Sequence, residues 1–371
     1  MIRRLYVHNF RCLENFELPV AGQRSMLLIG KNGSGKTSVG MALRILQQIA
    51  RGKNRVGDLV EPKDLARGRA DVPMRFVLEA ELDGSTFRYE LALELPSGFQ
   101  ELRVLEESLA VGESQAYRRS LADVQITGRN NREKPPAFRM DWHMVALPVI
   151  QEQSPSDPVA VFKRWLARMI LLRPVPELMT GESKKETLQP EGNGTNFAEW
   201  FTGVMAHAPS AYGKVERYLE ELLPDLREIR NPETGRDVRN LEVHFGNDKG
   251  VLRVAFEDLS DGEKCFLVAA VVLAANDTYG PLFCFWDEPD NYLALSEVGH
   301  FVLGLRKAFG KTGGQFVASS HNPEAIRHFS DETTFLLYRN SHLEPTIVQA
   351  VRELPERGDL VGALIRDDVR P

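Results

Sequence analysis

The pattern of apolar and polar residues near the N-terminus predicts several short strands and a helix that follow one another closely. Ile2–Phe10 and Phe16–Val20 predict two short strands. Met26–Ile29 is apolar throughout, as expected of a strand that is buried on both faces. A glycine-rich loop follows, and Thr37–Ile49 repeats its apolar residues at helical spacing. The sequence therefore predicts strand, glycine loop and helix in direct succession.

Three segments beyond the polar, turn-rich stretch 51–72 alternate apolar and polar residues, which is typical of strands with one buried face. Asp83 and Gly84 lie between the first two segments and form a dipeptide typical of tight hairpin turns. We therefore expect an antiparallel sheet, built as a lobe on the rest of the molecule. The three segments are Arg75–Leu82, Thr86–Leu93 and Glu101–Leu109.

The middle of the chain, from 156 to 230, is expected to be mainly helical. Val159–Leu172 has an amphipathic pattern, and Ala211–Ile229 predicts a second helix that is broken near Pro224. Residues 181–196 are polar and contain glycine, so we expect a mobile segment. A hairpin is predicted next, with strands over Val238–Phe245 and Val251–Phe256 and a turn over Asn247–Gly250.

Helices and buried strands alternate in the last third of the chain, which predicts an α/β fold. No internal repeat and no long heptad array is present. The predicted elements are a helix over Lys264–Asn276, a strand over Leu282–Trp286, a helix over Ser296–Phe309, a strand over Gln315–Ser319, a helix from Pro323 and two strands near 334–350.

The amino-acid composition excludes only a few classes of protein. The chain has 371 residues, of which 43% are hydrophobic and 26% charged, as in a globular protein with a sizeable core. A net charge of −6 gives no general attraction to nucleic acid or anionic membranes, although a basic loop at 128–136 leaves room for a local patch. Cys12, Cys265 and Cys284 are far apart, which predicts reduced thiols in a cytosolic protein. We read no signal peptide and no membrane span, and expect a cytoplasmic protein without a membrane partner.

The glycine-rich loop carries the clearest chemistry. Gly30–Thr37 fits G-x-x-x-x-G-K-[ST], the phosphate-binding loop, and lies between a predicted strand and a predicted helix. Such a loop wraps phosphate oxygens with backbone N–H groups, so side chains must be absent where the backbone approaches. Lys36 is expected to neutralise β- and γ-phosphate charge, and the Thr37 hydroxyl to bind Mg²⁺. The alternative is a glycine-rich turn before a helix.

Asp287 and Glu288 follow four apolar residues at the carboxyl end of a predicted buried strand, where α/β sheets place their ligands. Asp287 is expected to hold Mg²⁺ through water, and Glu288 to polarise an attacking water as a general base. The alternative is an acidic turn that ends the strand before Pro289.

Two further segments have both a structural and a functional interpretation. Ser260 to Glu263 forms a capping box before an apolar helix, and a helix N-terminus is equally a site for a phosphate. His321 lies just past a predicted strand and before Asn322, a predicted helix cap. Taken alone it is a loop histidine, but beside the other motifs a γ-phosphate contact is the favoured interpretation.

Together these segments resemble an ABC-type ATPase, and more closely the RecF/SMC and OLD-like branch with the stand-alone bacterial ATP-binding proteins of the AAA15/AAA21 class. Leu259–Lys264 resembles the branch's L-S-x-G-E/Q signature, Asn291–Leu293 its D-loop, and Ser319–Pro323 its switch-histidine segment. Asn9–Phe10–Arg11 followed by Glu14–Asn15–Phe16 resembles its N-terminal I-x-N-F-R-x-F motif. The likeness covers roughly 1–50 and 255–340 and is loose between them.

The resemblance implies a site for ATP and Mg²⁺ that is completed by a second copy. Two copies would pair head to tail, so that Ser260 and Gly262 of one contact the γ-phosphate held by Lys36 of the other, with His321 as sensor. It also implies a glutamine on Mg²⁺, for which Gln151 is the candidate and Gln153 the next. The implied nucleotide contacts are Arg11, Gly30, Asn32, Gly33, Ser34, Gly35, Lys36, Thr37 and Ser38.

On this basis we expect the head of an ABC-type P-loop ATPase with an antiparallel β lobe and a helical insertion. Residues 1–150 would hold the first half of the core and the lobe, 151–250 a mainly helical insertion, and 251–371 the second half of the core. The absence of a long coiled coil argues against a tethering SMC-type arm protein. We also expect no nuclease domain after Pro371 of the kind that OLD-type proteins carry.

The leading hypothesis is an ATPase that dimerises on ATP and uses the switch to control DNA or a protein effector, as in genome maintenance or antiphage defence. A first alternative is the nucleotide-binding subunit of a transporter, against which Asp261–Glu263 argues because such subunits carry L-S-G-G-Q. A second is a regulator that binds ATP only to hold or release a toxic partner. The pair Asp287 and Glu288 favours hydrolysis.

Overall fold

The computed structural model describes residues 1–127, 136–329, 333–353 and Gly362. Its centre is a six-stranded sheet in the order β10-β17-β18-β3-β19-β20. The first five strands are parallel and β20 is antiparallel to β19. The strands are β3 (Ser25–Ile29), β10 (Ile170–Leu172), β17 (Phe283–Asp287), β18 (Gln315–Ser319), β19 (Thr334–Tyr338) and β20 (Ile347–Ala350).

A second, eight-stranded antiparallel sheet forms the predicted lobe, in the order β2-β1-β4-β5-β6-β7-β8-β9. It is larger than the three predicted strands because both N-terminal strands join one edge and three further strands, β7 to β9, extend the other. The predicted turn is present: Asp83 and Gly84 have φ angles of 50° and 77° between paired strands. The strands are β1 (Ile2–His8), β2 (Phe16–Leu18), β4 (Met74–Leu82), β5 (Ser85–Glu94), β6 (Arg103–Val111), β7 (Ser114–Ser120), β8 (Asp123–Ile126) and β9 (Ala137–Arg139).

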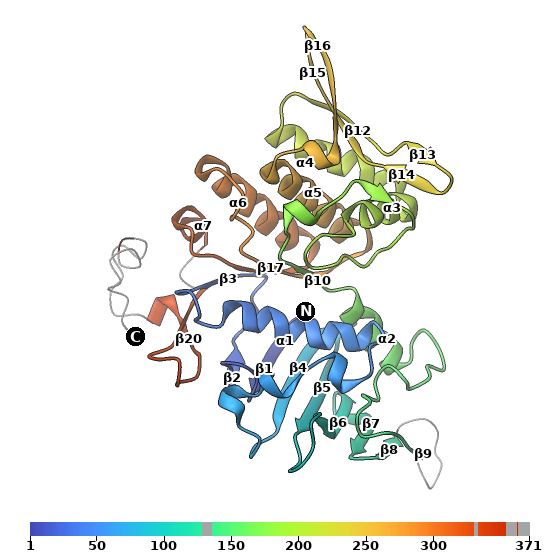
Figure 1. Ribbon diagram of the computed structural model, residues 1–371, viewed down its shortest axis with the longest axis vertical. Coiled ribbons are helices and arrows are strands. Elements are labelled where there is room, and N and C mark those ends of the chain that lie inside the picture. The colour runs from blue at the N-terminus through green and yellow to red at the C-terminus, as the bar shows by residue number, and fades with distance from the viewer. Residues whose placement is uncertain (128–135, 330–332, 354–361, 363–371) are drawn as a thin grey trace.

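Helix α1 (Lys36–Ala50) lies between the two sheets, with α2 (Pro158–Ala167) beside it (Figure 1). The apolar side chains of α1 join those of the lobe and of one face of the central sheet in a single buried cluster. This burial explains why a 15-residue helix with almost no charged residues is stable here.

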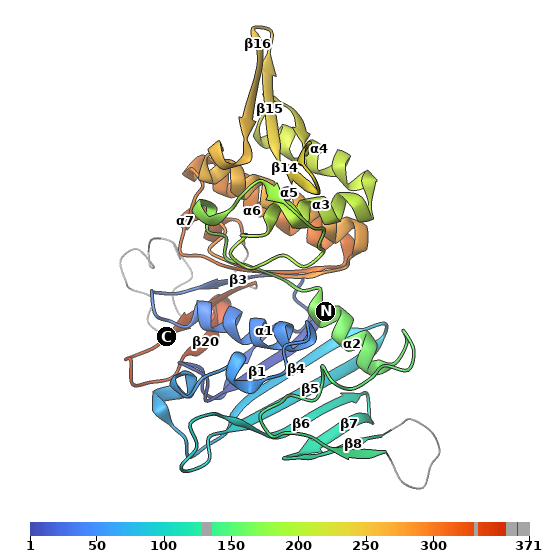
Figure 2. The ribbon, with the colours of Figure 1, turned by 45° about the vertical axis from the view of Figure 1, so that its right-hand side comes forward.

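The other face of the central sheet carries a layer of helices (Figure 2). Its centre is α5, whose residues are buried almost all round, so it shows no amphipathic stripe. The layer contains α3 (Phe197–His207), α4 (Tyr212–Leu222), α5 (Asp261–Tyr279), α6 (Leu295–Thr312) and α7 (Pro323–Arg327).

Two predicted helices are shorter than expected. The helix over Val159–Leu172 ends at Ala167, and Ile170–Leu172 is instead strand β10. Three consecutive apolar residues suit a strand buried on both faces, and periodicity alone does not separate that strand from a helix. The helix over Ala211–Ile229 ends at Leu222, because Pro224 cannot donate a backbone hydrogen bond to continue it.

Two small sheets complete the helical side. β12 (Leu226–Arg230), β15 (Glu242–Asn247) and β16 (Gly250–Ala255) form one, and β15 and β16 make the predicted hairpin, which projects from the molecule (Figures 1 and 2). The segment 181–196, expected to be mobile, contributes a strand to the other and is tied by backbone hydrogen bonds such as Thr187 to Glu199. That sheet contains β11 (Glu182–Ser183), β13 (Glu233–Gly235) and β14 (Val238–Asn240).

Short 3-10 turns link these elements. Within the described residues, no helix is both long and apolar enough to cross a membrane. The three cysteines are free, as predicted. The predicted basic loop, at 128–136, lies outside the described residues except for Pro136. The turns are η1 (Val56–Asp58), η2 (Pro62–Asp64), η3 (Ala66–Gly68), η4 (Pro176–Leu178), η5 (Pro209–Ala211), η6 (Phe256–Asp258) and η7 (Val351–Glu353).

Candidate functional site

The glycine loop joins β3 to α1, and its glycines are required by both conformation and space. Gly30, Gly33 and Gly35 have φ angles of 148°, 79° and 106°, which disfavour other residues. A Cβ on Gly35 would lie 2.6 Å from the Thr346 hydroxyl, and one on Gly30 would lie 2.1 Å from the Leu337 carbonyl oxygen. The loop is therefore pressed against β19 and the start of β20, where a side chain would displace it.

Two polar groups of the loop lie where they can bind an anion. The Lys36 ammonium donates to the carbonyl oxygens of Gly30, at 2.6 Å, and Lys31, at 3.3 Å. Burial lowers the pKa of Lys36, and the carboxylates of Glu288 and Asp287 act in the opposite direction. The Ser34 hydroxyl is buried and has no hydrogen-bond partner among the described residues. A bound phosphate would satisfy such a group.

Asp287 lies at the carboxyl end of β17 and is held by two hydroxyl groups. Thr37 Oγ1 donates to Asp287 Oδ2 at 2.9 Å, and Ser319, at the end of the neighbouring strand β18, donates to Oδ1. The parallel register places Asp287 beside Ser319. The predicted partners Thr37 and Asp287, 250 residues apart, are thus brought together.

Glu288 adopts a left-handed backbone conformation with φ of 54°. Its N–H donates to the carbonyl and hydroxyl oxygens of Ser319, both at 3.1 Å. The Asn291 amide donates to Glu288 Oε2 at 2.8 Å, and His321 Nδ1 lies 3.7 Å from Oε1. The predicted base and the predicted sensor are therefore neighbours. The roles of Ser319 and Asn291 in orienting the pair were not predicted.

The glycine loop and Glu288 border a cavity of about 630 Å³, here named the loop cavity, which lies within the size range of small-molecule sites. Gly33 to Ser38 and Asn32 line it, and Glu288 lies at its edge. Arg11 also lines it and forms an ion pair with Asp64 at 2.9 Å. The cavity thus brings together the predicted contacts from Asn32 to Ser38 and Arg11, whereas the predicted contact Gly30 does not line it.

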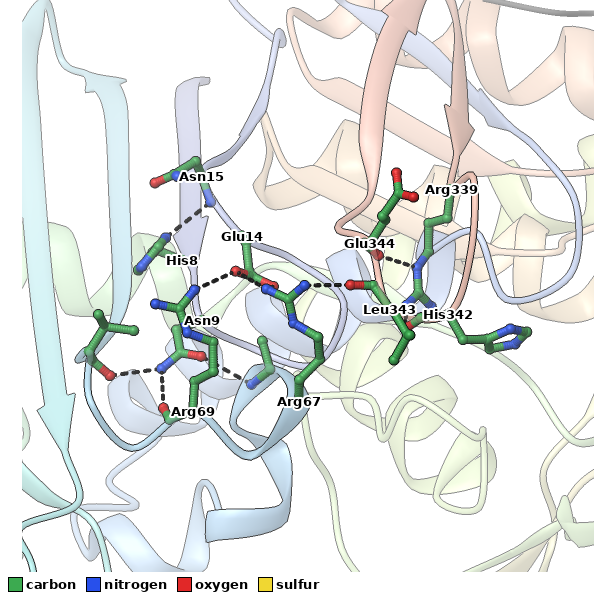
Figure 3. Close-up of polar contacts among 12 residues, drawn as sticks. His8, Asn9, Glu14, Asn15, Arg67, Arg69, Arg339, His342, Leu343 and Glu344 are labelled. Atoms are coloured by element: carbon green, nitrogen blue, oxygen red, sulfur yellow. Dashed lines mark hydrogen bonds and ion pairs between the residues drawn. The ribbon is translucent and has the colours of Figure 1, made fainter.

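Besides Arg173, which is described below, three basic residues of the loop cavity were not predicted: Arg67, Arg339 and His342. Figure 3 shows how neighbouring segments hold them. Arg67 pairs with Glu14 at 2.5 Å, and Arg339 donates to the carbonyl oxygens of Glu344, at 2.9 Å, and His342, at 2.6 Å. Arg67 and Arg339 come from segments far apart in the chain, so no local motif in the sequence could have identified them.

The predicted signature residues lie elsewhere. Ser260 caps α5: its hydroxyl accepts from the Glu263 N–H at 3.3 Å, and Glu263 Oε2 accepts from the Ser260 N–H at 2.8 Å, so the predicted capping box is present. Neither Ser260 nor Gly262 lines the loop cavity of its own chain. The Tyr292 carbonyl oxygen lies 3.2 Å from where a Gly262 Cβ would stand, which places the signature against the predicted D-loop.

Gln151 is exposed, and it lines neither the loop cavity nor a second cavity of about 500 Å³ beside Asp287. The structure therefore does not bring it to the other site residues. Arg173, the residue after β10, lines both cavities. It was missed because the segment that contains β10 was predicted to be a helix.

A comparison with known families shows which family the chain belongs to. A family model described as "AAA domain, putative AbiEii toxin, Type IV TA system" matches residues 25–327. The chain belongs to this family. The matched range contains the glycine loop, the signature, Asp287, Glu288 and His321. The predicted ABC-type ATPase of the SMC/RecF-like branch is confirmed.

Solved structures support the fold of this AAA-domain protein. A crystal structure of the SmcHead bound to the C-winged helix domain of ScpA has a TM-score of 0.56 at 15% identity, and covers 94% of this chain and 97% of that one. An Smc head domain with an extended coiled coil, bound to the C-terminal domain of ScpA derived from Pyrococcus furiosus, has a TM-score of 0.55 at 12% identity and covers 100% and 99%. At this identity the likeness shows the fold alone, and the predicted fold is confirmed. No curated protein matches the chain.

The site of this AAA-domain protein fits a nucleotide and a magnesium ion. The glycine cradle, Lys36 and the unpartnered Ser34 hydroxyl suit phosphate oxygens. No cluster of three or more histidine, cysteine, aspartate or glutamate side chains that could hold a metal occurs in the described part of the chain. Magnesium bound together with phosphates needs only one or two protein oxygens, which Thr37 and Asp287 offer.

Proposed function

We propose that this ATPase binds Mg·ATP in the loop cavity and hydrolyses it. The observation that carries the proposal is the hydrogen bond of 2.9 Å between Thr37 and Asp287. It joins the first turn of α1 to the end of β17, and the next residue is the carboxylate of Glu288. A phosphate loop, a metal-binding pair and a general base thus meet at one edge of the sheet, where parallel α/β sheets bind ligands.

Each group has a distinct role in the proposal. The backbone N–H groups of the glycine loop, the Ser34 hydroxyl and Lys36 bind the phosphates, with Asn32, Ser38 and Arg11 as further contacts. Thr37 and Asp287 hold the ion. Bound Mg²⁺ neutralises charge on the β- and γ-phosphates and orients them for in-line attack.

Glu288 acts on water. Its carboxylate takes a proton from the water that attacks the γ-phosphorus, while the bond to the β–γ bridging oxygen breaks and ADP and phosphate form. Asn291 supports this role, because its amide holds Oε2 and fixes the carboxylate plane. His321 lies beside Oε1 and can donate a hydrogen bond to the γ-phosphate.

A second copy completes the site in this proposal. Ser260 and Gly262 begin α5 in the helical layer and do not line the loop cavity of their own chain. A helix N-terminus with an exposed serine attracts phosphate, so the signature is suited to the γ-phosphate of a partner paired head to tail.

The output of the switch is proposed to be a DNA transaction or a partner effector, in genome maintenance or antiphage defence. The solved Smc heads were bound to domains of another protein, ScpA, which favours a protein partner for this chain as well. The family description names a toxin and a type IV toxin–antitoxin system, which favours a second candidate: a regulator that binds ATP to hold or release a toxic partner.

Turnover separates the two candidates. The wild-type protein should hydrolyse ATP in the presence of Mg²⁺, and Glu288→Gln should lower the rate by about 10²- to 10⁴-fold because the amide cannot accept a proton. ATP affinity should persist, and an ATP-bound dimer should accumulate on size-exclusion chromatography with light scattering. An Asp277→Asn control, at an exposed acid on α5, should keep the wild-type rate. A wild-type protein that binds ATP without turnover would favour the regulator.

A further inference from the structure

Arg173 occupies a position at the reactive end of the site that the sequence did not reveal. Strand β10 runs parallel to β17, with Leu172 beside Trp286. Asp287 follows Trp286 as the last residue of β17, and Arg173 directly follows the last residue of β10, so both lie at the carboxyl edge of the sheet. Asp287 lies at the end of the site where the metal ion and the γ-phosphate are proposed to bind. Arg173 therefore begins next to that end, on the same chain.

The backbone of Arg173 is fixed while its side chain is free to move. Its N–H donates to the Gly192 carbonyl oxygen at 2.7 Å, and the Val175 N–H donates to the Asn193 carbonyl oxygen at 2.9 Å. Pro174 restricts the chain between these two bonds. The side chain is 57% exposed, and its Nε lies 3.9 Å from Asp287 Oδ2. Asp287 is only 5% exposed, but at this distance the two groups form no hydrogen bond, so the guanidinium can turn to an anion that lies closer.

The surroundings show which anion the guanidinium can reach. Arg173 lines the loop cavity together with Lys36 and Glu288, and it also lines the second cavity with Asp287 and Asn291. It therefore borders the position between the base and the metal-binding pair, where the γ-phosphate is proposed to lie. When a metal ion engages Asp287, the guanidinium loses its carboxylate partner, and a phosphate is the ligand that its planar fork binds best.

The chemistry of arginine excludes for Arg173 the metal-binding role that the resemblance implies for a glutamine. A glutamine reaches a metal ion through its amide oxygen, but a guanidinium has only donors and no acceptor. Arg173 therefore cannot be a ligand of Mg²⁺, and it can act only on negative charge.

We propose that Arg173 binds the γ-phosphate of ATP held by its own chain and stabilises the charge on the phosphoryl group during transfer. This inference rests on the proposed function, because it needs ATP in the loop cavity. In this arrangement the chain that holds the ATP also supplies an arginine, from the end of β10. The second copy completes the rest of the site.

The test compares the affinities of the full-length protein for ATP and for ADP, measured by titration calorimetry with Mg²⁺ present. Arg173→Gln should weaken ATP binding about ten- to hundredfold, as expected for a lost charge-assisted contact, and leave ADP affinity within about twofold. Arg173→Lys should fall between, because an ammonium lacks the bidentate fork. The matched control is Arg168→Gln, an exposed arginine before the amino end of the same strand, which should change neither affinity.

A second arm separates a direct contact from an effect through Asp287. In an Asp287→Asn background, Arg173→Gln should still reduce the preference for ATP over ADP, because a direct contact with the γ-phosphate does not act through Asp287; the factor can change, since the two side chains are neighbours. A preference that no longer depends on Arg173 in that background would overturn the proposal and make Arg173 a positioning residue for Asp287. Equal losses for ATP and ADP, or no loss for ATP, would also overturn it. A wild-type protein that fails to bind ATP would instead refute the proposed function itself.

Discussion

At the scale of single residues, the site depends on backbone conformations that side chains normally disfavour. Glu288 is held at φ of 54° by two hydrogen bonds from its N–H to Ser319. Residues in this region cost about 1–3 kcal/mol each and persist only where the surroundings enforce them. Gly35, with a φ of 106° directly before Lys36, adopts such a conformation without this cost because it has no side chain. The positions of the base and of the lysine are thus set by their backbones.

Replacement of Gly35 tests this point at the phosphate loop. Gly35→Ala should abolish measurable ATP binding, because the added Cβ meets the Thr346 hydroxyl at 2.6 Å in addition to the unfavourable φ. Gly52→Ala is the matched control, since Gly52 has a similar φ of 103° with nothing within 4 Å of the added atom. It should cost about 1–2 kcal/mol of stability and leave ATP affinity unchanged. Equal ATP affinities in the two variants would refute the steric explanation.

At the scale of elements, one buried carboxylate accepts hydrogen bonds that connect several strands of the antiparallel lobe. Glu107 on β6 accepts hydrogen bonds from the N–H groups of Ala146, at 2.6 Å, and Leu147, at 2.8 Å, and from the hydroxyl groups of Tyr89 and Tyr117. Burial raises the pKa of Glu107, and these donors oppose that effect. The residue thereby links three strands of the lobe to the segment that follows it.

Loss of this link should destabilise the fold. Glu107→Ala leaves two buried N–H groups and two buried hydroxyl groups without a partner, so the free energy of unfolding should fall by about 3–5 kcal/mol in urea titrations. Glu106→Ala, at the exposed neighbouring position that pairs with Arg75, should change it by less than about 1 kcal/mol. A loss in the Glu107 variant no larger than in the Glu106 variant would show that the hydrogen bonds contribute little.

At the scale of the whole molecule, the two halves of the predicted ATP site lie on different layers. The phosphate loop and Glu288 line the loop cavity and Asp287 lines the second cavity beside it, both at the central sheet, whereas Ser260 and Gly262 begin α5 in the helical layer. The proposed head-to-tail pairing would bring the signature of one copy to the loop of the other. It would also make hydrolysis depend on protein concentration.

Mixing two inactive variants tests this arrangement. Ser260→Arg should abolish hydrolysis while leaving ATP binding to one chain intact, and Lys36→Ala should lose ATP binding. A mixture should regain part of the activity, because one intact composite site can form in a mixed dimer. The measurement is ATP turnover as a function of mixing ratio at fixed total protein. Activity that stays at the level of the separate variants at every ratio would contradict one functional site per mixed dimer.

The sequence by itself determined the motifs whose chemistry depends on local spacing. The glycine loop between β3 and α1, the acidic pair after β17 and the capping box of Ser260 were all predicted, because each needs only neighbouring residues and a buried strand or a helix start beside it. Tertiary structure alone decided what meets across long separations. It joins Thr37 to Asp287, brings Arg67 and Arg339 into one cavity, and brings Arg173 rather than Gln151 to the reactive end. These contacts follow from strand order and register, and a short apolar run such as Ile170–Leu172 does not reveal whether it is a helix or a strand until it is packed against β17.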